Sequence, residues 1–424
     1  MQDRQAWIRH GQELRRPLLV NQALADEGHV VVVGAGLSGL AAAYRLREAR
    51  PDVRITILER SNRAGGVIRT WRKDGWVGEF AVNASRPHPA VWRLIDDLGL
   101  MPSWQPSRAE ARRRWILNDG RRHRLGLSTV LKAGPRRMLS GIRAARRGGR
   151  SMAEALPVAW LADAMTHGIV NAPATEVDAD LLMPTMARYG ADPPMRQQAL
   201  ARAVRGTYPG WTPQRGQMGS LDQGMDGLVE ALIEALSDDA MVDTQFNVDA
   251  PSPQAAADHA GLTLASVLWA APRTEDEPGP ELTVAVVGYT HADTAAIPVG
   301  YGTLCPDPSS PVSGILHESD VHHGARAPSG HRLFRVMVPH ARWDGEERSL
   351  QRAVEAMLCP AEPVLFEVLG TRRVPHVRPG HMQRVAEHAA PWSWIGWSAT
   401  GVAITHVVSE AERLADLLQQ RHAQ

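Results

Sequence analysis

The chain has 424 residues, a formal net charge of +1 and two cysteines, Cys305 and Cys359. A chain of this length buries a large core in two or three domains, and its balanced charge lacks the long-range field that draws proteins to nucleic acid. The isolated cysteines form neither a disulfide framework nor a metal-type spacing, so we expect a reduced cytoplasmic protein without a metal.

Residues 1–28 precede the first predicted strand. Asp3 and Arg4 place charge where a secretory signal is apolar, so no signal peptide is expected. No run in the sequence approaches the roughly 20 apolar residues of a membrane helix. We predict an N-terminal extension that contains a surface helix and a tail.

The stretch from His29 to Glu59 is predicted to form a strand, a tight turn, a helix and a second strand. A valine run bounded by glycine is typical of a strand buried on both faces, and an Ala/Leu-rich segment with helical periodicity follows it. In the G-x-G-x-x-G turn between them, the first glycine makes the turn, the second lets the backbone approach a diphosphate, and the third allows close packing. A carboxylate about 20 residues further on can bind ribose hydroxyls. This pattern indicates either a dinucleotide site or a purely structural turn, and the predicted contacts are Gly34, Gly36, Leu37, Ser38, Gly39 and Glu59.

A second glycine turn follows the second strand. An arginine and paired glycines offer another backbone approach to phosphate, which nicotinamide enzymes rarely need, and this favours FAD. The predicted contacts are Arg60, Arg63, Gly65, Gly66 and Val67. With these motifs the chain resembles the flavin amine oxidase superfamily, and more closely the oxygen-dependent protoporphyrinogen oxidases, over nearly its whole length from His29 onward.

The resemblance implies an α/β fold in which a Rossmann-like FAD-binding domain of the glutathione-reductase type adjoins an antiparallel-sheet substrate domain and a helical insert. We assign residues 29–82, 216–273 and 376–424 to the FAD-binding domain, and residues 83–111 and 274–375 to the substrate domain. Residues 112–215 form the insert. The residue patterns predict a helix over 91–98, a basic hairpin over 112–123, a buried strand within 262–272, and strands over 282–289 and 333–338.

The resemblance also implies two substrate contacts. In the family a loop of the form Glu-x-Gly-Pro-Asn lies under the flavin ring; Glu79 and Asn83 match it, whereas Ala81 and Val82 replace Gly-Pro. An arginine in the basic strand that follows binds a propionate of the tetrapyrrole, and Arg114 occupies that position. The arginine fork suits a carboxylate because it offers two parallel hydrogen bonds. The alternative for Arg114 is a solvated basic hairpin.

The insert and the later sheet supply further predicted contacts. Family members often dock on membranes through this insert, and the basic segment 134–150 is either such a surface or a solvated helix. Gly168 matches a family string that lines the active site, and His322 stands where an aromatic side chain usually contacts the substrate. The histidines near Asp320 lack a metal-ligand spacing, so we expect a polar pocket wall there and no metal.

The C-terminal part reads as a strand, a glycine loop and the N-terminus of a long helix, an arrangement directed at phosphate. In the family the equivalent loop closes over FAD. Ala403 replaces a family glycine, which requires a negative φ at this position. The nearby tryptophans either line the flavin site or pack in the hydrophobic core. The predicted contacts are Gly396, Trp397, Gly401, Val402 and Ala403.

The two lysines, Lys73 and Lys132, both lie early in the chain, whereas the amine-oxidising branch places a lysine beside the flavin from its later half. The resemblance thus implies an FAD-dependent oxidase that converts a porphyrinogen to a porphyrin in haem biosynthesis, reducing O2 to peroxide without an obligatory side-chain base. The alternatives are oxidation of coproporphyrinogen or of another apolar substrate, and an FAD-binding scaffold without turnover. The sequence leaves open a homodimer and contact with the inner face of a membrane.

Overall fold

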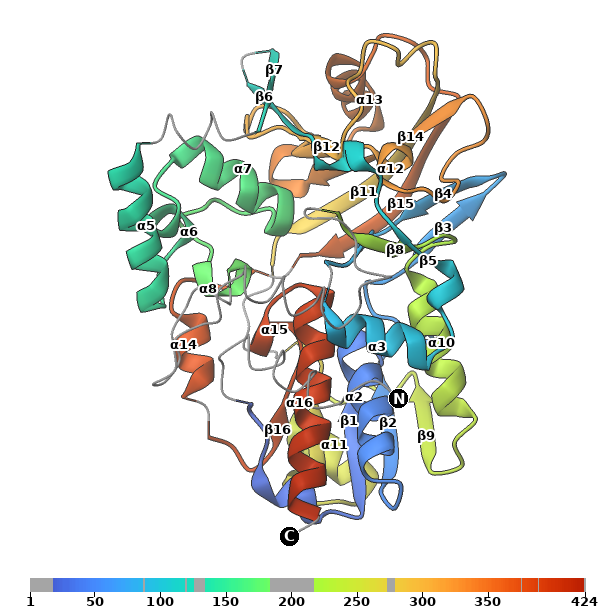
Figure 1. Cartoon of the computed structure of the whole chain (residues 1–424), viewed down its shortest axis with the longest axis vertical. Helices are drawn as coiled ribbons and strands as arrows, with labels where there is room; N and C mark the ends of the chain where they lie inside the picture. The colour runs from blue at the N-terminus through green and yellow to red at the C-terminus, as the bar shows by residue number, and fades with distance from the viewer. Residues whose placement is uncertain are drawn as a thin grey trace.

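The computed structural model describes residues 18–86, 88–118, 120–125, 134–183, 217–272, 279–374, 376–387 and 389–422. The described strands form a seven-stranded sheet and a parallel five-stranded sheet. Figure 1 shows the first above the second, with the helices α5 to α8 to one side. Chain segments that are far apart in sequence lie side by side in both sheets. The fold class is therefore the predicted one, an FAD-binding Rossmann-like unit joined to a substrate sheet.

The parallel sheet has the strand order β16-β10-β1-β2-β9. Its central strand β1 (His29–Val33) pairs on both sides with parallel neighbours, so its valines are buried on both faces. The other strands are β2 (Arg54–Glu59), β9 (Val242–Phe246), β10 (Val267–Trp269) and β16 (Ser393–Trp394). All the pairings are parallel, which brings the carboxyl ends of the strands to one edge.

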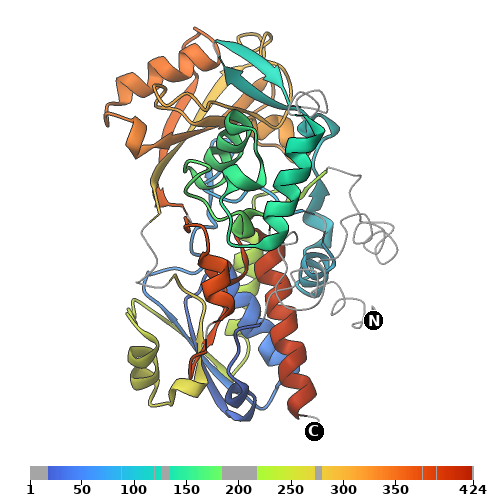
Figure 2. The same cartoon turned by 90° about the vertical axis from the view of Figure 1, so that its left-hand side faces the viewer.

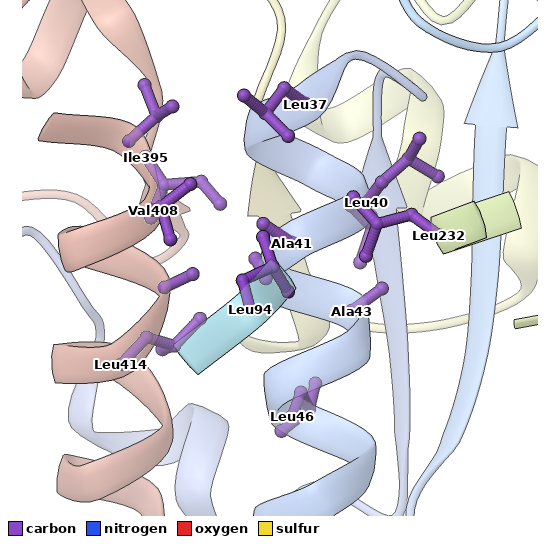
Figure 3. Close-up of a cluster of buried hydrophobic side chains, with 14 of the residues drawn as sticks. Leu37, Leu40, Ala41, Ala43, Leu46, Leu94, Leu232, Ile395, Val408 and Leu414 are labelled. Carbon is purple, nitrogen blue, oxygen red and sulfur yellow. The ribbon is translucent and has the colours of Figure 1, made fainter. Parts of the chain in front are cut away.

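Four helices cover one face of this sheet: α2 (Leu37–Ala49), α3 (Pro89–Asp97), α10 (Asp226–Ser237) and α16 (Ile404–His422). Figure 3 shows Leu40 and Ala41 of α2 between Leu232 of α10, Leu94 of α3 and Val408 of α16. Helix α11 (Pro253–Ala260) covers the other face. The buried Trp394 packs there as a core residue.

Helix α3 corrects one predicted domain boundary. Residues 83–111 were assigned to the substrate domain, but the apolar face of α3 is buried against α2 and α16 in the FAD-binding unit. The following segment contains β5 (Trp104–Pro106), which pairs with β8 (Gly219–Leu221) as a separate antiparallel ribbon. The partners of both elements are distant in sequence, so the local pattern did not reveal them.

The seven-stranded sheet has the order β15-β11-β14-β13-β12-β6-β7 and is antiparallel except between β12 and β6. Its strands are β6 (Arg114–Asn118), β7 (Arg121–Arg124), β11 (Glu281–Thr290), β12 (Gly302–Leu304), β13 (Gly314–Leu316), β14 (His331–Pro339) and β15 (Leu365–Arg373). The predicted basic hairpin is confirmed as β6 and β7. Its assignment to the helical insert is wrong, because β6 pairs with β12 and extends the substrate sheet.

One face of this sheet packs against α13 (Glu347–Met357). The opposite face, which we call the inner face, meets the hairpin of β3 (Thr70–Lys73) and β4 (Trp76–Glu79) and the helix α7 (Ala159–Val170). Short helices α12 (Glu318–Val321), α14 (His381–Ala386) and α15 (Trp397–Thr400) complete the two units.

The helical insert contains α5 (Pro135–Arg147), α6 (Met152–Ala155), α7 and α8 (Ala179–Leu182), and its predicted remainder, residues 184–215, lies outside the described residues. Figure 2 shows these helices packed below the substrate sheet. Of the helices described, none has both the length and the apolar character that crossing a membrane requires. Membrane contact through α5 stays a prediction.

Candidate functional site

The first glycine turn joins β1 to α2, and each of its glycines has a separate physical role. Gly34 has a φ of +101°, which favours glycine. Gly36 precedes α2, no side chain caps the helix there, and a Cβ on Gly36 would meet nothing within 4 Å. A Cβ on Gly39 would overlap the carbonyl oxygen of Gly34. The turn thus presents an uncapped helix N-terminus to open space, as a diphosphate requires.

The second glycine turn lies directly against the first. The amide of Gly65 donates to the carbonyl oxygen of Ala35 at 2.8 Å, and a Cβ on Gly66 would lie 3.4 Å from the Cα of Gly36. Gly65 and Gly66 both have positive φ values, +103° and +58°. The structure therefore brings together the two backbone approaches that the sequence analysis placed on separate motifs.

Glu59 stands at the end of β2 and links these two turns. Its Oε2 accepts from the amide of Ala35 at 2.9 Å, and its Oε1 accepts from the amide of Ser61 at 2.9 Å. Arg63 donates to the carbonyl oxygens of Ala64 and Gly66, whereas Arg60 and Val67 are exposed. The carboxylate is thus held at the strand edge where a ribose would lie.

The third turn follows β16 and adjoins the first. A Cβ on Gly396, whose φ is +104°, would lie 3.3 Å from the hydroxyl oxygen of Ser38 in α2. Gly401 has a φ of +129°, and a Cβ on it would lie 3.1 Å from the carbonyl oxygen of Leu181 in the insert. Ala403 is not among the described non-glycine residues with positive φ, so alanine is accommodated there.

Trp397 and Val402 extend this third turn toward the substrate side. Both are partly buried and pack against a hydrophobic cluster that includes Leu282 of the sheet and Met152 of the insert. The C-terminal turn therefore lies at the junction of the FAD-binding unit, the substrate sheet and the helical insert. A flavin ring placed beside this turn would be in reach of residues from all three.

Comparison with known proteins agrees with this geometry. The profile of the family described as "Flavin containing amine oxidoreductase" matches residues 37–240. Over these residues the chain is similar to the flavin amine oxidase superfamily. Its cofactor is FAD, and the three adjacent turns with the uncapped N-terminus of α2 fit that cofactor.

Individual relatives of the superfamily include porphyrinogen and amino-acid oxidases. The chain is 26% identical to coproporphyrinogen III oxidase of Propionibacterium freudenreichii subsp. freudenreichii, over 92% of this chain and 91% of the relative. It is 45% identical to L-amino acid oxidase Lm29 of Lachesis muta over 82 residues, which span 19% of this chain and only 16% of the relative. A proposed protoporphyrinogen oxidase from Exiguobacterium sp. 255-15 has a TM-score of 0.67 at 18% identity, covering 93% of this chain and 99% of that one, and shows the fold alone.

Two predicted substrate contacts come together on the substrate side of this flavoprotein. The buried Asn83 accepts a hydrogen bond through its Oδ1 from the hydroxyl of Tyr301 at 3.4 Å, and the guanidinium of Arg114 lies over the ring of Tyr301 at 4.7 Å. The Nδ2 of Asn83 is buried and has no acceptor among the described residues. We call Asn83, Arg114 and Tyr301 the donor cluster, because it offers hydrogen-bond donors and lacks an acidic partner among the described residues.

Tyr301 was missed by the sequence analysis. Its place beside Arg114 follows from the parallel pairing of β12 with β6, in which Gly302 lies opposite Arg114. These strands are nearly two hundred residues apart in the sequence, and a short basic strand carries no signal for which later strand it will pair with. The glycine-rich segment around Tyr301 was the only local indication of an unusual position.

His322 does not contact the donor cluster in the described part of the chain. Its Nε2 lies 3.4 Å from Oε2 of the fully buried Glu318, and Glu318 also pairs with Arg335 at 3.0 Å. Burial, assisted by the charge of Arg326 and outweighing the pull of Glu318, lowers the pKa of His322, which favours the neutral imidazole. The contacts of His322 are those of a buried polar core residue, so its predicted substrate role lacks support from the geometry.

Gly168 is explained by packing. It lies within α7, and a Cβ on it would lie 2.6 Å from the Cδ2 of Leu304 in β12. The missing side chain therefore lets α7 approach the inner face of the sheet. In the described residues, no group of three or more His, Cys, Asp and Glu side chains is arranged to hold a metal ion.

The loop after β4 is held by arginines of the substrate unit. Arg335 donates to the carbonyl oxygens of Glu79 at 2.7 Å and Ala81 at 3.0 Å. Ala81 and Val82 stand where the family has Gly-Pro, so backbone restriction by proline is absent here. These hydrogen bonds fix the loop that carries Asn83 in another way.

Proposed function

We propose that the chain is an FAD-dependent oxidase that converts a porphyrinogen to a porphyrin. The donor cluster carries this proposal, because Arg114 and the buried Nδ2 of Asn83 offer an acidic group donors that have no acidic partner among the described residues. A propionate is such a group, and it would be bound by a charge-assisted hydrogen bond from Arg114. The full-length similarity to a coproporphyrinogen III oxidase supports the same substrate class.

The side chains have holding and orienting roles in this reaction. The amides at the start of α2 would bind the diphosphate, and Glu59 would bind the adjacent ribose. Arg114 orients the macrocycle through its propionate, while Arg335 keeps the loop of Asn83 in place. FAD held by these residues would supply the redox chemistry, in which six hydrogens leave the porphyrinogen and three O2 are reduced to hydrogen peroxide.

Anaerobic mixing tests the proposal. Protein loaded with FAD is mixed separately with reduced porphyrinogens, primary amines and L-amino acids, and the flavin absorbance is followed. We expect bleaching with a porphyrinogen, and peroxide once air is admitted. Bleaching only with amines or amino acids would overturn the porphyrinogen assignment, and a flavin that none of the three bleaches would favour the scaffold alternative.

Variants of neighbouring arginines locate the propionate contact. Arg114→Gln should lower kcat/KM for the porphyrinogen by about 10- to 100-fold, the effect of losing one hydrogen bond to a charged group. Arg113→Gln removes an exposed charge at the next position and should leave kcat/KM nearly unchanged. An equal decrease in kcat/KM for the two variants would mean that Arg114 contributes only through the overall positive charge of this segment and not through a direct contact with the propionate.

A further inference from the structure

Three arginines lie on the inner face of the substrate sheet. Residues directly opposite each other in paired strands point to the same side, as do residues two apart in one strand. Arg114 of β6 lies opposite Gly302 of β12, which in turn lies opposite Leu316 of β13. Leu316 lies opposite Arg335 of β14, and Arg335 lies opposite Val286 of β11. Leu282, on the same face of β11, lies opposite Arg372 of β15. Arg114, Arg335 and Arg372 therefore point to one side.

These arginines differ in what they contact. Arg335 forms an ion pair with Glu318, and its Nη1 donates to the carbonyl oxygens of Glu79 and Ala81. Arg372 has no acceptor in the described part of the chain, and its Nε is buried. Burial, together with the nearby positive charge of Arg335, lowers the pKa of Arg372 to about 10. At neutral pH it remains a guanidinium cation, and no described residue supplies its counterion, which is costly unless an anion binds.

The position of Arg372 separates it from the donor cluster. In the order β15-β11-β14-β13-β12-β6, five inter-strand steps lie between Arg372 and Arg114, or about 24 Å at the usual strand spacing. Two acidic groups on one edge of a ligand cannot reach both ends of the face. A ligand that uses both arginines needs acidic groups on opposite edges.

We propose that Arg372 binds a second carboxylate of the substrate, at the end of the inner face opposite to Arg114. This inference rests on the proposed function and narrows its substrate. Coproporphyrinogen carries a propionate on every pyrrole ring, so it presents acidic groups on opposite edges. Protoporphyrinogen carries its two propionates on neighbouring rings, at one edge. The geometry therefore favours the tetracarboxylate as the substrate.

The neighbouring residue Arg373 provides a matched control. It lies on the opposite face of β15, is exposed, and pairs with Glu281 at 2.9 Å. Binding of the product porphyrins to FAD-loaded protein is measured by fluorescence titration for Arg372→Gln, Arg373→Gln and the unaltered chain. We expect Arg372→Gln to weaken binding of coproporphyrin III by about 10- to 100-fold and to change the affinity for protoporphyrin IX very little. Arg373→Gln should leave the affinity for both porphyrins unchanged. Equal affinities for coproporphyrin in both variants would overturn the proposal.

A second measurement needs no variant. The unaltered protein should show a KM for coproporphyrinogen at least tenfold below that for protoporphyrinogen. Equal KM values, with flavin bleaching by both substrates, would overturn the role of Arg372 and leave the porphyrinogen oxidase assignment standing. If neither substrate bleaches the flavin, the proposed function itself fails. Arg372→Lys keeps the positive charge but loses the paired N–H donors of the guanidinium. We therefore expect its affinity for coproporphyrin to lie between those of the unaltered protein and Arg372→Gln.

Discussion

The carboxylate of Glu79 and the guanidinium of Arg326 form an ion pair at 3.0 Å in which neither side chain is exposed. Glu79 also accepts from the hydroxyl of Thr70 and the amide of Met225, and Arg326 also donates to the carbonyl oxygen of Leu221. The pair thus ties the β3–β4 hairpin to the segment that leads into α10. It joins the substrate side to the FAD-binding unit through buried polar groups, of which the Nε of Arg326 has no hydrogen-bond partner among the described residues.

Removing one partner of this ion pair should lower the free energy of unfolding far more than removing both charges together. Arg326→Met leaves the Glu79 carboxylate buried without a cation and should lower the free energy of unfolding by about 3–5 kcal/mol. The double variant Glu79→Gln, Arg326→Met removes that charge and should recover at least half of the loss. Urea unfolding of the single and double variants measures both values. A double variant no more stable than Arg326→Met would show that the loss arises elsewhere.

The glycines of the first turn should separate cofactor binding from folding. Gly36→Val places its side chain in the open space that the diphosphate needs, so it should weaken FAD binding at least tenfold while the thermal midpoint of the flavin-free protein changes little. Gly39→Val meets the carbonyl oxygen of Gly34 and should cost more than about 3 kcal/mol of stability. The exposed Gly28, where a Cβ is equally unobstructed, supplies the control Gly28→Val. Loss of stability in Gly36→Val would contradict the role of this space.

Gly168 should behave as a packing residue. Gly168→Ala gains helix propensity, about 1 kcal/mol, but its Cβ crowds Leu304, and such overpacking costs about 1–3 kcal/mol. We expect a net loss of about 1 kcal/mol in urea unfolding, removed when Leu304→Val shortens the neighbour. Kinetic constants should not change. A raised KM at unchanged stability would instead restore the substrate role predicted from the sequence.

Buried histidine makes stability depend on pH. The pKa of His322 is lowered by burial, so below about pH 6.5 the unfolded chain binds a proton that the folded chain does not. Stability is therefore full above that pH and declines as the pH falls, by at most about 1.4 kcal/mol per pH unit. His322→Gln should flatten this decline between pH 7.5 and 5.5 in urea unfolding, and His323→Gln, at an exposed position, should not. An unchanged slope in His322→Gln would assign the decline to other groups, such as His317.

The nucleotide-binding turn could be predicted because its information is local. The valines of β1, the glycine spacing and Glu59 lie within about thirty residues, and each acts on its immediate neighbours. The negative φ required of Ala403 could be stated for the same reason. These elements appear in the structure where the pattern placed them.

The substrate side could be predicted only in part because its contacts are formed between distant strands. Arg114 and Asn83 were identified, but Tyr301 joins them only through the pairing of β6 with β12. Helix α3 has a clear amphipathic pattern, yet no local feature tells which unit its apolar face will contact. His322 was assigned from its position in the chain, and the buried partner Glu318 decides its role.

The turn at Gly396 belongs to the last strand of the parallel sheet, β16, which also bridges to Leu19 near the other end of the described chain. A ribosome must therefore synthesise the chain at least as far as Gly396 before the cofactor cradle can close. Until then the apolar faces around β1 and β10 have no final neighbour, and they need protection from aggregation. Capture of FAD by all three turns therefore requires that β16 has already been made.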